Sequence, residues 1–81
     1  MSKEMLNELV EATVTDVLFA DQTGDAETWK EIKYRLAILG PIQAAYVVAE
    51  SAIKLVHDED ALDALENLSS YLEIWGSSTH A

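Results

Sequence analysis

The chain has 81 residues and a formal net charge of −10, because 15 acidic side chains face five basic ones. A surface this acidic repels nucleic acid and anionic membranes, so we expect neither direct nucleic-acid binding nor membrane binding. The chain contains no cysteine, which excludes disulfides and thiolate zinc sites. Its length predicts one domain over residues 1–76, followed by a disordered tail over residues 77–81.

No stretch of the sequence has the pattern of a targeting or membrane-spanning segment. The N-terminal residues 1–4 carry no apolar signal region, and no apolar run approaches the roughly 18 residues of a membrane span. We therefore expect a cytoplasmic protein and a complete small gene product. A domain of this size buries only about 60% of the surface that its unfolded chain exposes. Because no disulfide is available, we expect a partner subunit, most simply in a homodimer.

The first predicted helix runs from about Lys3 to Ala20. Ser2 precedes it as the expected N-cap, and Glu4 lies in the first turn, where the helix dipole favours an anion. Apolar and small residues recur at helical spacing, which predicts one core-facing side. The residues expected on that side are Leu6, Leu9, Val10, Thr13, Val17 and Ala20.

A turn-rich loop over residues 21–25 separates this helix from a second one, predicted from about Ala26 to Leu39. Thr23 or Asp25 is expected to cap it. Asp16, on the flank of the first helix, is expected to form an ion pair with a cation of the second. The three candidate cations are Lys30, Lys33 and Arg35, and the expected core stripe is Trp29, Ile32, Leu36 and Leu39.

Gly40 and Pro41 predict the end of the second helix and the start of a third, which extends to about Val56. The third helix is apolar around more than half of its circumference, so we expect it to be central or to meet a second subunit. Its expected core face is Ile42, Ala45, Ala49, Ala52, Ile53 and Val56, and the apolar arc is widened by Ala44, Val48 and Leu55.

Asp58 is the expected cap of a fourth helix, predicted from about Glu59 to Trp75 and ended by Gly76. No segment shows the alternation of a strand. Helices joined by short links predict an all-α fold, a compact bundle of about four short helices arranged as two helical hairpins.

Acidic side chains concentrate in the first and the last predicted helices. Residues 1–28 and residues 55–81 each carry a net charge of −6, whereas residues 29–54 carry +2. Two outward-facing acidic stripes follow from the helical spacing, and we expect them to bind a protein partner with a basic surface. The stripes are Glu4, Glu8 and Glu11 in the first helix, and Glu59, Asp63, Glu66 and Glu73 in the fourth.

Some apolar residues are not obviously needed by the bundle core. Several such residues together mark an interface. We expect one here, formed by Leu18, Phe19, Tyr34, Ile38, Val48 and Ile74. A Val48→Glu substitution is then expected to split the homodimer, because it buries an unpaired charge.

Two metal-dependent alternatives depend on carboxylate spacing. The loop from Asp21 has the alternating oxygens of a calcium site, but Ala26 stands where the site needs Gly and Ile32 where it needs a bidentate Glu. Carboxylates three residues apart on facing helices can hold magnesium against a diphosphate, as in small all-helical nucleotide pyrophosphohydrolases. The candidate carboxylates are Glu8, Glu11, Asp60, Asp63 and Glu66, and their spacing places most of them on outward faces.

The sequence shows no other group of residues with the pattern of a catalytic site. His57 is followed by acids, but its simplest role is to favour the end of one helix while the acids favour the start of the next. No cysteine nucleophile exists, and no serine has a suitably placed histidine base. We therefore expect no catalytic residues, no cofactor and no bound metal.

In bulk properties the chain resembles the small, acidic, cysteine-free helical inhibitors of phages and mobile elements, which include DNA mimics. The resemblance implies a non-enzymatic regulatory protein that docks on a basic, nucleic-acid-handling partner. The alternatives are a magnesium-dependent, pyrophosphohydrolase-like enzyme and a purely structural assembly protein.

Overall fold

The computed structural model describes residues 2–68, and all of the regular structure in this range is helical. Helix α1 spans Lys3–Thr23, α2 spans Ala26–Leu39 and α3 spans Pro41–Lys54, while a further helical segment covers residues 59–68. The prediction of an all-α bundle of four short helices is confirmed. The predicted end of the fourth helix, its stop at Gly76 and the tail lie outside the described residues.

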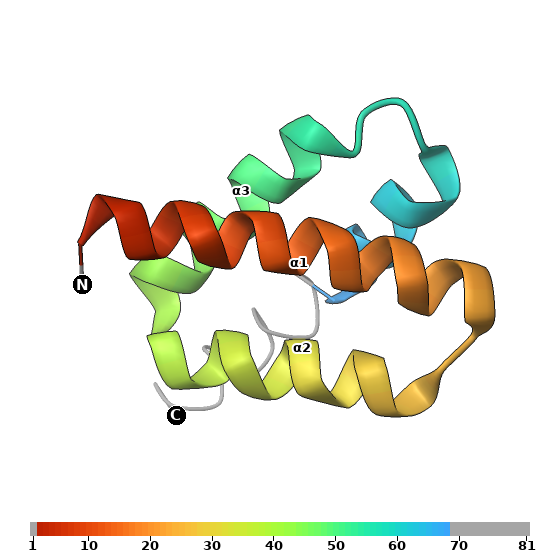
Figure 1. Cartoon of the computed structure of the whole chain (residues 1–81), viewed down its shortest axis with the longest axis horizontal. Coiled ribbons are helices and arrows are strands. Elements are labelled where there is room, and N and C mark those ends of the chain that lie inside the picture. Colours follow the sequence, from red (N-terminus) through yellow and green to blue (C-terminus); the bar gives the residue numbers. More distant parts are fainter. Residues whose placement is uncertain (1, 69–81) are drawn as a thin grey trace, which may run out of the picture.

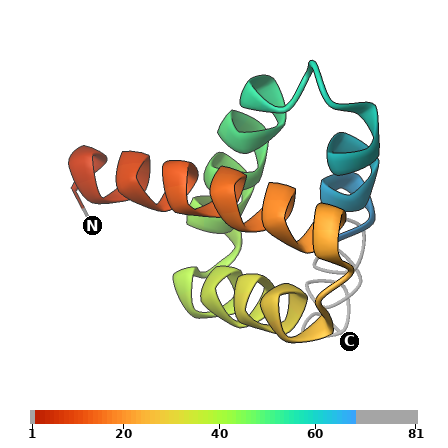
Figure 2. The same cartoon turned by 45° about the vertical axis from the view of Figure 1, so that its right-hand side comes forward.

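Helix α1 is the longest element, and the other helices are arranged around it. Figure 1 shows α1 and α2 running side by side in opposite directions, with α3 crossing behind α1. Figure 2 shows the helical segment 59–68 beside the C-terminal half of α1. Each of α1, α2 and α3 contacts the other two. No helix within residues 2–68 combines the length and the apolar character of a membrane span.

The helix starts are fixed by local hydrogen bonds that the sequence predicts. The Met5 amide donates to Ser2 Oγ at 3.2 Å, and the Glu27 amide donates to Asp25 Oδ1 at 3.1 Å. Asp25 is therefore the cap of α2, and its other oxygen accepts a hydrogen bond from the Thr28 hydroxyl at 2.8 Å. The segment 59–68 begins in the same way, because Asp58 Oδ1 accepts from the Ala61 amide at 3.2 Å. Each cap satisfies an amide that the helix itself leaves unpaired.

Helix α1 ends three residues later than predicted, at Thr23. Gly24 follows with φ 68°, and its amide donates to the carbonyl of Ala20 at 2.8 Å. This left-handed closure is available to glycine at little steric cost, so the helix continues to the residue before it.

The core draws on all four helical segments. The predicted core faces of α1 and α2 are confirmed, since Val10, Val17, Ile32 and Leu36 are buried. Trp29 and several other apolar residues cover the core and remain partly exposed. The buried apolar residues are Val10, Val17, Ala20, Ile32, Leu36, Ala44, Val47, Leu55, Ala61, Leu65 and Leu68.

The predicted core face of the third helix is wrong at most of its positions, although Ala52 packs against the core. Ile42 is 85% exposed and Ile53 is 66% exposed, whereas Val47 and Ser51 are completely buried. At about 100° per residue, the buried residues lie on the side of α3 opposite to Ile42 and Ile53. The helix also ends at Lys54 rather than near Val56. The prediction failed because α3 is apolar nearly all round, so its hydrophobic pattern does not select one side.

Candidate interaction surfaces

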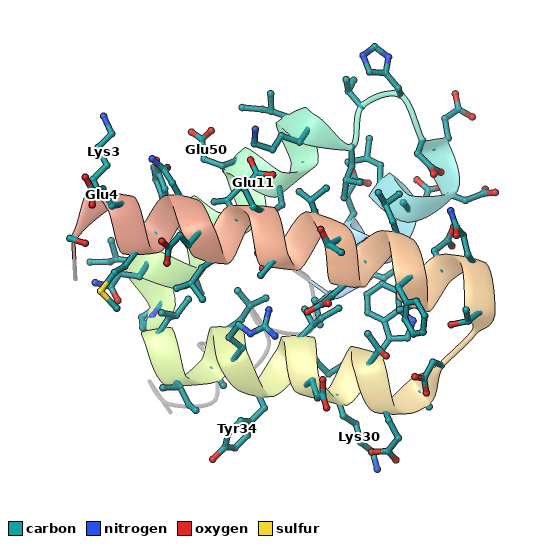
Figure 3. All side chains as sticks on the ribbon, viewed as in Figure 1. Lys3, Glu4, Glu11, Lys30, Tyr34 and Glu50 are labelled. Atoms are coloured by element: carbon teal, nitrogen blue, oxygen red, sulfur yellow. The ribbon has the colours of Figure 1, made fainter. Side chains whose placement is uncertain are left out.

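The acidic stripe of α1 is exposed along its length. Glu4, Glu8 and Glu11 follow one another at the i, i+4, i+7 spacing of a helix face, and all three are solvent-exposed. Glu11 forms an ion pair with Lys54 of α3 at 3.1 Å, but its side chain is still 68% exposed. Figure 3 shows Glu11 and Glu50 pointing to the same edge of the molecule, one from α1 and the other from α3.

The second acidic stripe lies on the segment 59–68. Glu59, Asp63 and Glu66 are exposed there, while Glu73 lies outside the described residues. Figures 1 and 2 show this segment beside the C-terminal half of α1, whereas Glu4–Glu11 lie on its N-terminal half. The two stripes are therefore separate surfaces at opposite ends of α1.

Two residues of the predicted apolar interface are placed in or near the core instead. Leu18 and Val48 are partly buried and pack against the core cluster, so the core uses part of their apolar surface. Phe19, Tyr34 and Ile38 are exposed. Figure 3 shows Tyr34 pointing away from α1. The remaining member, Ile74, lies outside the described residues.

The structure exposes a set of apolar residues that includes Tyr34 and Ile38 of the predicted interface together with α3 residues that the sequence pattern had placed in the core. Its residues lie on α2 and α3, on either side of the Gly40–Pro41 junction, and we call this set the apolar face. Its members are Tyr34, Ala37, Ile38, Pro41, Ile42, Ala45, Ala49 and Ile53. The signal that could have located it is the excess of apolar residues on α3, which are more numerous than one core-facing side of a helix requires.

A hollow of about 620 Å³ lies where the end of α1, the start of α2 and the segment 59–68 meet. Trp29 and Leu68 contribute apolar walls, Lys30 and Lys33 contribute cations, and Asp21 contributes a carboxylate. Lys30 also forms an exposed ion pair with Glu27 at 3.7 Å. Sequence reasoning did not predict this hollow.

The carboxylates of the metal-dependent alternatives do not converge. Glu8 and Glu11 on α1, and Asp60 and Asp63 on the segment 59–68, are all exposed. Within residues 2–68, no three His, Asp or Glu side chains come together as a group that could hold a metal ion. His57 is exposed in the turn after α3. The inward-facing carboxylates that a magnesium-diphosphate site needs are absent from this part of the chain.

Asp16 is the acidic residue of α1 with a structural partner on α2. Its Oδ2 lies 3.1 Å from Arg35 Nη2, and both side chains are about 30% exposed. This confirms the predicted pairing of Asp16 with a cation of α2 and selects Arg35. The carboxylates of the stripes have far more solvent around them, so they are the ones available to a partner.

No protein-family model, curated protein or solved structure matches this chain.

Proposed function

We propose that this protein is a non-enzymatic interaction protein whose exposed acidic stripes dock on a basic surface of a nucleic-acid-handling partner. The observation that supports it is the exposure of the stripe carboxylates. Six of them lie within the described residues, and only Glu11 has an ion-pair partner there. Glu8, Asp63 and Glu66 have neither a helix-terminal position nor an ion-pair partner among the described residues, and repulsion between like charges destabilises the fold. Their retention on the surface favours a role in binding.

Charge density bears on how closely such a stripe can imitate a nucleic acid. Glu4, Glu8 and Glu11 place three charges over about 10 Å of helix, at 1.5 Å rise per residue. A DNA strand carries one charge per about 3.4 Å. One stripe therefore offers a row of anions somewhat sparser than a phosphate backbone, which is sufficient to attract a basic groove and to raise the association rate.

The test uses partner captured from the native host and measures association and dissociation rates at two ionic strengths. The variant Glu59→Gln/Asp63→Asn removes two charges from one stripe, and Glu4→Gln/Glu8→Gln removes two from the other. The control Glu27→Gln/Glu31→Gln removes two exposed charges from α2, outside both stripes. We expect a stripe variant to slow association about tenfold at low salt and the control to change it little.

A competition measurement identifies the surface on the partner. If the stripe occupies a nucleic-acid groove, duplex DNA must displace the protein from its partner in a saturable manner. Affinity that is the same for all three variants, with a flat response to salt, contradicts the proposal.

A further inference from the structure

The exposed residues from Tyr34 to Ala49 share one property, which is that all of them are apolar. Exposed positions in this stretch occur on both α2 and α3, and none carries a charge. They are Tyr34, Ala37, Ile38, Pro41, Ile42, Ala45 and Ala49. One quarter of the whole chain is charged, so a run of exposed positions without any charge is unexpected for a surface that meets only water.

On α3 the exposed apolar residues recur with the spacing of one helix side, and the smallest of them are at the centre. Ile42, Ala45, Ala49 and Ile53 recur at spacings of three and four, which places them on one side of the helix. Ile42 and Ile53 project at the two ends, and the two alanines leave a shallow stretch between them. A second helix can approach closely over alanines while its own larger residues fit at the ends.

Charge favours a second copy of this chain as the occupant of the face. The face lies within residues 29–54, the part of the chain with a net charge of +2, whereas the rest of the chain carries −12. Two copies that meet elsewhere bring acidic helices together, and two copies that meet here do not. A basic partner, by contrast, gains more from the acidic stripes, which lie outside this face.

The pattern on α3 is also self-complementary under a two-fold rotation. Along the helix the side chains are large at Ile42, small at Ala45 and Ala49, and large again at Ile53. When two α3 helices pair in opposite directions about a point near residue 47, Ile42 of each copy meets Ile53 of the other. The alanines then face one another at the centre. Such an isologous contact closes after two subunits.

We propose that the protein forms a homodimer through the apolar face, with the two α3 helices antiparallel and Ala45 and Ala49 at the two-fold axis. This inference does not depend on the proposed function. In this arrangement Ala45 and Ala49, rather than Val48, are the central interface residues of α3, because Val48 packs against the core.

The first experiment is sedimentation of the full chain and of Ala49→Glu across a wide concentration range. Ala49 is exposed, so the variant keeps its fold, which circular dichroism checks. The matched control is Thr15→Glu, which adds the same charge at an exposed position of α1. We expect Ala49→Glu to raise the dimer dissociation constant on the order of 100-fold, because two unpaired charges enter the interface. Thr15→Glu is expected to leave the dimer essentially intact.

The second experiment tests the antiparallel arrangement and does not depend on a disrupting variant. The chain has no cysteine, so Ala45→Cys and Ala49→Cys each introduce a single thiol. In an antiparallel pair, position 45 of one copy lies near position 49 of the other. A mixture of the two variants is therefore expected to form disulfide-linked dimers faster than either variant alone.

Three results overturn the proposal. One is a clean monomer at several hundred micromolar, which indicates that the face binds a different partner. Another is an Ala49→Glu variant that dimerises as tightly as the full chain. The third is cross-linking that is fastest for a single variant, which indicates a parallel contact or a different face.

Discussion

The guanidinium of Arg35 and the carboxylate of Asp16 lie 3.1 Å apart and connect α2 to α1. Both side chains are about 30% exposed, so the pair lies at the border of the core. Asp16 binds Nη2 of the arginine, while Nη1 is buried and has no hydrogen-bond partner among the described residues. Among the described residues, Asp16 is the carboxylate that compensates the charge of Arg35.

Removal of Asp16 is expected to cost more stability than removal of Arg35. Asp16→Ala leaves a partly buried cation unpaired, whereas Arg35→Met leaves a carboxylate that can turn toward solvent. A double-mutant cycle is expected to give a coupling free energy of about 1 kcal/mol in chemical denaturation. The control is the exposed pair Glu27 and Lys30, whose coupling is expected to be below about 0.5 kcal/mol. Equal couplings for the two pairs contradict this reading.

Two side-chain hydroxyls are buried in the helix packing, one on α1 and one on α3. The side chains of Thr13 on α1 and Ser51 on α3 are fully buried, and neither hydroxyl has a hydrogen-bond partner among the described residues. Thr13→Val keeps the shape and removes the unpaired group, so we expect it to raise the free energy of unfolding by about 1 kcal/mol. Thr15→Val on the exposed side of the same helix is the control, with little expected change. A loss of stability in Thr13→Val shows that the hydroxyl is satisfied.

Gly24 is required by its backbone conformation. Its φ of 68° is left-handed, and apart from its chain neighbours no residue has an atom within 4 Å of the position that a Cβ would occupy. Gly24→Ala is therefore expected to cost about 1–2 kcal/mol of stability from the backbone alone. Asn tolerates this conformation better, so Gly24→Asn is expected to cost less than Gly24→Ala. Thermal unfolding of the two variants tests this order, and the reverse order contradicts it.

Neighbouring positions on α3 are expected to respond very differently to a glutamate. Val48 packs against the core, whereas Ala49 is exposed. Val48→Glu is expected to destabilise the fold by roughly 2–4 kcal/mol, because a charge enters a partly buried apolar site. Ala49→Glu is expected to change the stability of the subunit by less than about 0.5 kcal/mol. Chemical denaturation at low protein concentration separates this effect from dimer dissociation. Equal losses for the two variants contradict the assignment of faces on α3.

Divalent cations provide a direct test of the metal-dependent alternatives. The exposed and separate carboxylates described above predict that magnesium or calcium changes the melting temperature only by screening repulsion. A saturable rise at micromolar metal is the opposite outcome, because a ligand that binds the native state stabilises it. That outcome favours a metal-binding protein over the proposed interaction protein.

The sequence by itself determined where the helices of the described part begin. Ser2, Asp25, Pro41 and Asp58 act on amides or backbone angles within a few residues of themselves, so their effect is local and readable. It also determined the buried sides of α1 and α2, since polar residues leave only one apolar side on each. The exposure of the acidic stripes in the described part followed from the same spacing.

Only the tertiary structure decided which side of α3 is buried. Its polar residues Gln43, Glu50 and Lys54 occupy a narrow strip, and the rest of the circumference is apolar. Two opposite orientations therefore satisfy the hydrophobic pattern about equally. The contact of Lys54 with Glu11 of α1 and the burial of Leu55 after the helix are consistent with the observed one. Because these contacts join residues far apart in the chain, no local pattern encodes them, and the apolar face was visible only once the helices were packed.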